Sequence, residues 1–258
     1  MLRFASLGSG SGGNALLVEA REGGRCTRVL LDCGFNARAL ALRLARLGLA
    51  PADLDAIVVT HEHSDHIGGV AVLARRHRLP VYASAGTARS GRLTDAGIAL
   101  ECIGSGHSVA IGALELSPYA VPHDAAEPLQ LVFSDGASRL GVLTDIGTPT
   151  AAVQAALDGV DALVLEANHD PDLLQSGPYP GFLKARIAGA LGHLSNAQAA
   201  SLLAALDTRR LHCVVAAHLS STNNRADLAR AALAGALGWP DEMVVVADQA
   251  RGCDWQAV

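Results

Sequence analysis

Thr60-His61-Glu62-His63-Ser64-Asp65-His66, directly after the apolar run Leu54–Val59, is the stretch of this sequence that decides its fold. Three imidazoles and a carboxylate within six residues, following a strand rich in β-branched residues, indicate a metal site at the strand's carboxyl end. His61 and His63 are two residues apart and can converge on one ion. Asp65 and His66, at the turn into a helix expected near Ile67, can reach a second ion. A helix cap would explain the aspartate alone, but it would not explain three histidines.

The composition indicates a folded protein without a global attraction for polyanions. With 258 residues, the chain is long enough for one large domain or two small ones. Hydrophobic residues make up 50% and charged residues 17%, which excludes extensive disorder. Aromatic residues make up only 3% and the net charge is −5. Both values argue against a broad surface on which the bases of a single-stranded nucleic acid stack and its phosphates are neutralised. Lys184 and the arginines can still form local clusters.

The cysteines and the apolar runs predict a cytoplasmic location. Five scattered cysteines, odd in number and without a C-x-x-C pair, are typical of free thiols in a reducing compartment. The segment Met1–Phe4 leads into a strand without a charged and apolar leader, and no apolar run reaches the length that spans a membrane. We therefore expect no membrane partner.

A glycine-rich segment near the N-terminus allows two interpretations. Gly8, Gly10 and Gly13 satisfy G-x-G-x-x-G after the strand expected at Leu2–Leu7, a pattern that also occurs in dinucleotide-binding folds. That fold needs a full helix next, but only Ala15–Arg21 is present before a turn at Glu22-Gly23-Gly24. A β-hairpin therefore fits better, and the glycines are expected to let backbone amides approach an anionic ligand.

Strands and helices alternate along the rest of the chain, with a change of pattern in the middle. Short strands with turns between Ile98 and Leu143 predict antiparallel sheet. No linker or low-complexity segment divides the chain, so we expect a single domain over residues 1–258 with two facing sheets between helical layers, an αββα sandwich. The helices are expected at Ala37–Leu47, Gly69–His77, Gly86–Leu93, Thr150–Leu157, Ala197–Leu206 and Ala226–Leu237, with a further helix that carries Lys184 and Arg186 and is expected to face phosphate.

The H-x-H-x-D-H pattern at a strand end resembles the signature of the metallo-β-lactamase fold superfamily. The resemblance implies a four-layer αββα sandwich with further ligands, in order, on later strand ends. His123, in Val121-Pro122-His123-Asp124, and His218, after the strand at Leu211–Ala217, match the remaining histidine ligands. Asp145 matches the aspartate that bridges two metals in the hydrolases of the superfamily. β-Lactamases of this fold often have a cysteine at the second metal, so Asp145 points away from β-lactam hydrolysis.

The resemblance therefore implies a dinuclear centre. Zinc suits the histidines, although the carboxylates also admit manganese or iron. Two ions bridged by Asp145 are expected to activate a water molecule as hydroxide near neutral pH. The expected ligands are His61, His63, His123 and Asp145 at one ion, and Asp65, His66, Asp145 and His218 at the other.

Further residues are expected around these ligands. Asp32 and Glu166, each at the end of a strand, are expected to support the ligands from behind, although Asp32 is equally explained as a turn residue. His169 is expected to face the substrate or to support a ligand, with a purely structural role as the alternative. Asn14, Ser195 and Ser220 complete the residues expected to bind the substrate.

Four motifs narrow the resemblance to the YycJ/WalJ-type branch, which is related to ribonuclease Z and to cyclic phosphodiesterases. They are Gly-Ser-Gly-Ser-Gly-Gly-Asn, Glu-Ala-Asn-His-Asp, Gly-His-Leu-Ser-Asn and His-Leu-Ser-Ser-Thr-Asn-Asn. His193 matches the placement of an active-site histidine of ribonuclease Z, which implies that it acts as a general acid. Asp65 is the other residue expected to be catalytic.

The resemblance implies a metal-dependent phosphodiester hydrolase, with a DNA exonuclease as the leading hypothesis. A small cyclic phosphodiester is the alternative substrate, because the chain is acidic, poor in aromatic residues and without a nucleic-acid-clamping insertion. A thioester hydrolase of the glyoxalase II type uses a similar pair of metals. A metal-dependent binding protein is disfavoured because every expected ligand is present. The oligomeric state stays open.

Overall fold

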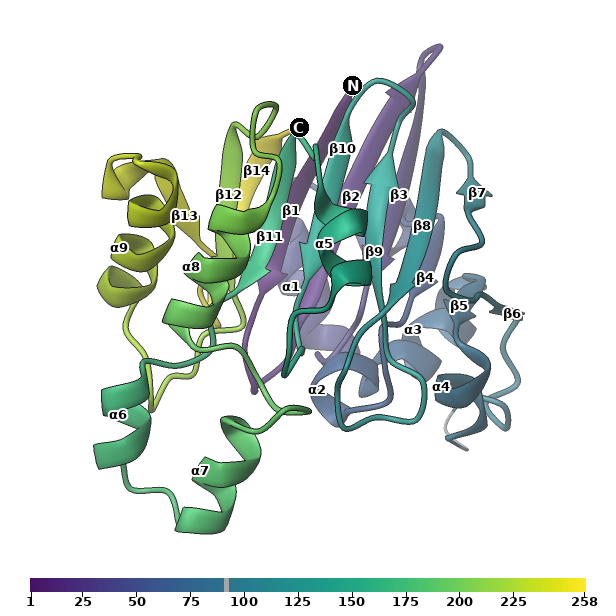
Figure 1. Cartoon of the computed structure of the whole chain (residues 1–258). Helices are drawn as coiled ribbons and strands as arrows, with labels where there is room; N and C mark the ends of the chain where they lie inside the picture. The colour runs from purple at the N-terminus through teal and green to yellow at the C-terminus, as the bar shows by residue number, and fades with distance from the viewer. Residues whose placement is uncertain (91–92) are drawn as a thin grey trace.

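Two sheets lie face to face in the computed structural model, which describes residues 1–90 and 93–258 (Figure 1). Within these residues each sheet has seven strands, and helices cover the outer face of each sheet. The arrangement is the four-layer αββα sandwich that the sequence predicts. None of the helices in the described ranges combines the length and the apolar character that crossing a bilayer requires.

The first sheet has an antiparallel half and a parallel half. β1 pairs with β14 and β2, and β2 pairs with β3, all antiparallel, whereas β3, β4, β5 and β6 run parallel. The strands in spatial order are β14 (Cys253–Ala257), β1 (Leu2–Gly8), β2 (Ala15–Glu22), β3 (Arg25–Leu31), β4 (Ala56–Val58), β5 (Val81–Ala83) and β6 (Leu100–Cys102).

The second sheet repeats this division. Its antiparallel half runs from β7 to β10, and its parallel half runs from β10 to β13. The strands in spatial order are β13 (Val244–Val246), β12 (Cys213–Ala217), β11 (Ala162–Glu166), β10 (Arg139–Leu143), β9 (Leu129–Ser134), β8 (Leu114–Ala120) and β7 (Val109–Ile111).

The helices divide between the two outer faces. Leu40, Leu44 and Leu73 of α1 and α3 pack on the first sheet, whereas Leu157 and Leu203 of α5 and α8 pack, with α9, on the second. The helices are α1 (Ala37–Ala45), α2 (Ser64–Ile67), α3 (Val70–His77), α4 (Ala85–Arg89), α5 (Ala151–Leu157), α6 (Pro171–Ser176), α7 (Gly181–Ile187), α8 (Asn196–Ala205) and α9 (Ala226–Leu237), with short 3₁₀ turns at Pro51–Asp53 and Asp241–Met243.

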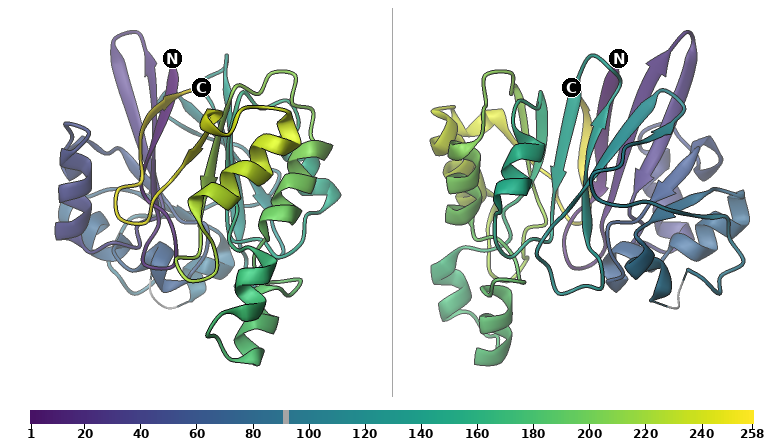
Figure 2. Two further views of the ribbon diagram at one scale, coloured as in Figure 1. Left: turned by 90° about the vertical axis from the view of Figure 1, so that its left-hand side faces the viewer. Right: turned by 45° about the vertical axis from the view of Figure 1, so that its right-hand side comes forward.

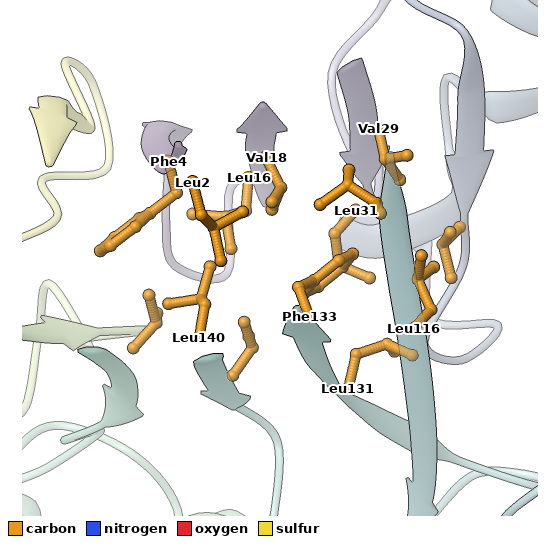
Figure 3. Close-up of a cluster of buried hydrophobic side chains, with 14 of the residues drawn as sticks. Leu2, Phe4, Leu16, Val18, Val29, Leu31, Leu116, Leu131, Phe133 and Leu140 are labelled. Atoms are coloured by element: carbon orange, nitrogen blue, oxygen red, sulfur yellow. The ribbon is translucent and has the colours of Figure 1, made fainter. Parts of the chain in front are cut away.

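The apolar layer between the sheets follows from the alternation of side chains along each strand. On β2, Leu16 and Val18 face the second sheet, whereas Leu17 faces the helices, as the two-residue period of a strand requires. Figure 3 shows Phe4 and its neighbours meeting Phe133 and Leu140 from the opposite sheet. Phe4 and Phe133 have no exposed surface, so this layer fixes how the two sheets face each other.

Most of the expected elements are present, with one correction and one omission. The glycine segment leads into the β1–β2 hairpin rather than into a helix. The strand near Glu101 was expected in antiparallel sheet, but β6 pairs parallel with β5 because the connection through α4 crosses over. The helix α6 was not foreseen, although Asp170 caps it and Pro171 begins it. The helix expected at Gly86–Leu93 is α4, and residues 91 and 92 of that range lie outside the described residues.

One buried carboxylate holds three arginines of the first sheet together. Glu19 has no exposed surface, and its carboxylate accepts hydrogen bonds from Arg3 (2.7 Å), Arg21 (3.0 Å) and Arg28 (2.7 Å). Burial alone would raise the pKa of Glu19, but hydrogen bonds from Cys26 and the three guanidinium groups outweigh it and lower the pKa to about 2.

Replacing Glu19 with Gln should therefore lower the free energy of unfolding by about 2 kcal/mol at neutral pH. The value is below the full effect of the shift because Arg21 is half exposed. The folded pKa lies below the ordinary value of 4.5, so this stabilisation is complete above about pH 4.5 and is lost as the pH falls toward 2. Denaturant unfolding over this range should show the wild type and the variant converging at low pH.

Glu22→Gln, at the exposed end of the same strand, is the matched control and should change the unfolding free energy by less than about 0.5 kcal/mol. An equal effect of the two substitutions would contradict the role of Glu19.

Candidate active site

The carboxyl ends of several strands from both sheets meet at one edge of the sandwich. Asp32 follows β3, Asp145 follows β10 and His218 follows β12, and all three have a positive φ (62°, 52° and 54°). A left-handed residue directly after a strand turns the chain sharply, and it costs about 1 kcal/mol or more outside glycine. Such strain is concentrated at functional sites, and here it occurs at three of the residues that the sequence singles out.

One group of three histidines lies at the end of β4 and in the loop after β8. Nε2 of His61 is 3.0 Å from Nδ1 of His63, and Nε2 of His123 is 3.3 Å from the same atom. Burial lowers the pKa of His61 and of His123, so both rings are neutral near pH 7 and keep a lone pair for a cation. The ring nitrogens lie close enough together to hold one ion.

A second group adjoins the first. Asp65, His66 and His218 offer ligand atoms within reach of one ion, with Nε2 of His218 3.6 Å from Oδ2 of Asp65. Asp145 lies between the two groups: its oxygens are 3.2 Å from Nε2 of His66, 3.4 Å from Nδ1 of His218 and 4.0 Å from Nε2 of His123. The structure thus brings together all seven side chains that the sequence suggested as ligands.

Unsatisfied atoms test whether a cation fits here. Oδ2 of Asp145 and Nε2 of His218 are buried, and neither forms a hydrogen bond of acceptable geometry with a described residue, although Nε2 of His66 lies 3.2 Å from the first and Oδ2 of Asp65 lies 3.6 Å from the second. Leaving such atoms without a partner is costly, and a cation would satisfy both. Asp145 is not the N-cap of the following helix, because Thr150 caps α5, so a structural role as a helix cap does not explain this aspartate. The residues present therefore fit a metal centre with nitrogen and oxygen ligands.

Asp32 supports one histidine directly and a second one through Thr60. Oδ2 of Asp32 accepts hydrogen bonds from Nδ1 of His66 (2.8 Å) and from the hydroxyl of Thr60 (2.9 Å). The Thr60 hydroxyl is also 2.9 Å from Nδ1 of His61. Carboxylates that orient a ligand histidine from behind fix its tautomer and its ring plane. Thr60 was not foreseen, although it directly precedes the histidines.

Glu166 supports the site from the second sheet. Oε1 accepts hydrogen bonds from Nδ1 of His193 (2.8 Å) and Nδ1 of His218 (3.2 Å), and Oε2 accepts from the backbone of Ile146 and Leu194. Burial would raise the pKa of Glu166, but the two histidines outweigh burial and lower the pKa to about 2. Glu166 is therefore a carboxylate that orients both rings.

The backbone amides of the glycine segment bond to other parts of the protein and are not free to bind an anion. The amides of Gly8, Gly10, Gly12 and Gly13 all donate to protein oxygens, which corrects the expectation that they are free for a ligand. Gly10 donates to Oδ1 of Asn14, whose Nδ2 lies 3.2 Å from Oδ2 of Asp65 and 3.0 Å from Nε2 of His66. The loop thus holds Asn14 against the second group.

A cavity of about 390 Å³ opens over the two groups. Ser220 lines it, whereas His169 and Ser195, also expected at the substrate, are buried elsewhere, with Ser195 capping α8. Several further lining residues were not foreseen as site residues, because their approach depends on how the loops fold back. Among them are Ser11, Asp124, Asn168 and Tyr179. Asp124 had one local signal, its position next to His123.

Comparison with known proteins yields one family and several relatives. A family model described as a Beta-lactamase superfamily domain matches residues 27–214. The chain is 36% identical to exodeoxyribonuclease YycJ of Bacillus anthracis, over 89% of this chain and 86% of that protein. It is 32% identical to exodeoxyribonuclease WalJ of Streptococcus pneumoniae, over 93% and 89%. The metallo-β-lactamase fold protein YhfI from Bacillus subtilis has a similar fold, with a TM-score of 0.74 and 17% identity over 99% of this chain and 98% of that one.

We expect His123→Ala to reduce the content of divalent metal after dialysis by about one ion per chain, because one of three converging nitrogens is removed. A metal at about a hundred times its dissociation constant stabilises the folded state by about 2.7 kcal/mol, so the rise in Tm on adding metal should also shrink. Elemental analysis and thermal unfolding measure the two effects.

His107→Ala is the matched control, since His107 is exposed and bonds only to the carbonyl of Ser105 among the described residues. Equal metal content in both variants and in the wild type would rule out His123 as a ligand.

Proposed function

The chain belongs to the metallo-β-lactamase fold superfamily, among the relatives of YycJ and WalJ, and we propose that it is a DNA exonuclease with two divalent metal ions. Its general class of activity is metal-dependent phosphodiester hydrolysis. The main support for the finer proposal is the position of Asp145 between two ligand groups at the floor of one cavity. Both relatives are exodeoxyribonucleases, which supports DNA as the substrate.

His61, His63 and His123 would hold one ion, Asp65, His66 and His218 the other, and Asp145 would contact both. Such ions supply Lewis acidity, which lowers the pKa of a bound water and neutralises charge on phosphoryl oxygens. Zinc is the ion we propose, because five of the seven side chains are imidazoles, with manganese or iron as the alternatives.

The remaining steps belong to the side chains that line the cavity. Water attacks the phosphorus, and the bond to the leaving nucleoside oxygen breaks. Oδ2 of Asp65 faces Asn14 and His218, which leaves Oδ1 as the atom that we assign to accept the proton of the water. Glu166 holds Nδ1 of His193, so Nε2 is the nitrogen that can donate a proton to the leaving oxygen.

The experiment that tests the function compares three substrate classes in the metal-reconstituted protein. We expect stepwise shortening of 5′-labelled DNA, slower turnover of bis-p-nitrophenyl phosphate, and no cleavage of a thioester. Asp145→Asn should reduce the shortening of DNA at least about a hundredfold, since even groups behind metal ligands contribute tenfold to a hundredfold. Asparagine tolerates the positive φ at this position, so the backbone is preserved.

Turnover of the small diester without DNA shortening would instead establish a small-molecule phosphodiesterase. Cleavage of the thioester alone would overturn phosphodiester hydrolysis altogether.

His193→Ala should lower kcat for DNA by about 10²- to 10⁴-fold, because the leaving alkoxide needs a proton. The loss on bis-p-nitrophenyl phosphate should be much smaller, since p-nitrophenolate leaves readily without one. Parallel rate measurements on the two substrates give the ratio directly. His212→Ala, an exposed histidine before β12, is the control. The general-acid role is excluded if His193→Ala loses the same factor on both substrates.

A further inference from the structure

A short helical arm extends from the site edge of the second sheet. We use the name arm for residues 171–187, which contain α6 and α7. Figures 1 and 2 show both helices projecting beyond the ends of the strands, on the side of the molecule where α2 lies. The arm is thus part of the surroundings of the cavity rather than of the sandwich.

Three residues along the arm form part of the cavity wall. These residues are Tyr179, Leu183 and Ile187. Leu183 and Ile187 are four residues apart and lie on one face of α7, whereas Tyr179 precedes the helix. The Tyr179 hydroxyl lies 3.2 Å from Oγ1 of Thr222 in the loop after β12. This contact anchors the arm to the loop after β12.

Arg186 provides the cationic group of this wall. Among the described residues that line the cavity it is the one arginine or lysine, and three carboxylates line the same cavity, those of Asp65, Asp124 and Asp145. Its guanidinium pairs with Asp124 at 2.6 Å, and both side chains are partly exposed. Exposed ion pairs are weak, so a phosphate can replace Asp124 as the partner of Arg186.

Phe182 lies one helical turn before Arg186 on the same face of α7. Its side chain is 78% exposed, which is unusual for a phenylalanine in a chain with only nine aromatic residues of the Phe, Trp and Tyr type. An exposed ring beside a cation at the edge of a cavity matches the way single strands are bound: bases stack on rings and phosphates pair with cations.

We propose that the arm binds the nucleotide next to the scissile phosphate of a single-stranded DNA end, with Phe182 stacking on its base and Arg186 pairing with its phosphate. This inference rests on the proposed nuclease function. A cavity of about 390 Å³ is within the range of sites for small molecules, so it has room for a terminal nucleotide.

The test is binding of a fluorescent single-stranded oligonucleotide in the presence of EDTA, where no turnover occurs, by fluorescence anisotropy. Phe182→Ala should weaken binding roughly tenfold, and Phe182→Trp should restore it, because stacking needs only an aromatic face. Arg186→Ala should reduce the dependence of log affinity on log salt concentration by about one unit, as expected for one lost phosphate contact. Leu42→Ala is the control, since Leu42 is a 64% exposed apolar residue on α1.

An abasic site next to the end of the strand tests stacking directly. The affinity of the wild type should fall on the abasic strand, and Phe182→Ala should then cause no further loss. Full additivity of the two changes, or a Phe182→Ala variant that binds like Leu42→Ala, would overturn the proposal.

DNA shortening by the metal-loaded wild type separates this inference from the function on which it rests. A wild type that does not shorten DNA overturns the proposed nuclease and the arm together. A wild type that shortens DNA, with Phe182→Ala and Leu42→Ala equal to it in KM, overturns the arm alone.

Discussion

The apolar layer between the two sheets is the contact on which the site depends. His61, His63, Asp65 and His66 follow a strand of the first sheet, whereas Glu166 ends one strand of the second sheet, and Asp145 and His218 follow two others. The two halves meet only because Phe4, Phe133 and their neighbours fix the spacing and rotation of the sheets. Since such layers are packed like crystals, they transmit small shifts, and a repacked layer would move one half of the ligands relative to the other.

The site has two kinds of side chain: those that face the cavity, and those that lie behind them and hold them in place by hydrogen bonds. Asp32 and Glu166 are almost fully buried carboxylates, one behind each half, and each accepts hydrogen bonds from side chains around the centre. Asn14 performs a similar task from the glycine loop. Rings held in this way lose little entropy when a cation binds, because their orientation is already set.

The sequence predicted the parts of this arrangement that have a local signal. The histidine box was recognisable from spacing, and the alternation of strands and helices along the chain indicated sheets covered by helices. The parallel pairing of β6 with β5 could not be predicted, because β6 has only three residues, two of them exposed, and it carries no pattern that distinguishes parallel from antiparallel sheet. Contacts such as Asn168 to the carbonyl of His218 or Arg186 to Asp124 join residues 50 and 62 positions apart. They depend on how loops return to the edge of the sheets, and no local pattern encodes that.

The pairing of β1 with β14 has a consequence for the way this protein folds. The edge of β1 is covered by residues some 250 positions later, and the Ser9 hydroxyl accepts the amide of His218, 209 positions away. Closing such long loops costs entropy before any contact repays it, so folding is expected to be slow. During synthesis the histidine box emerges long before its partners on the second sheet. The complete centre therefore forms late, and no short contiguous fragment of the chain contains it.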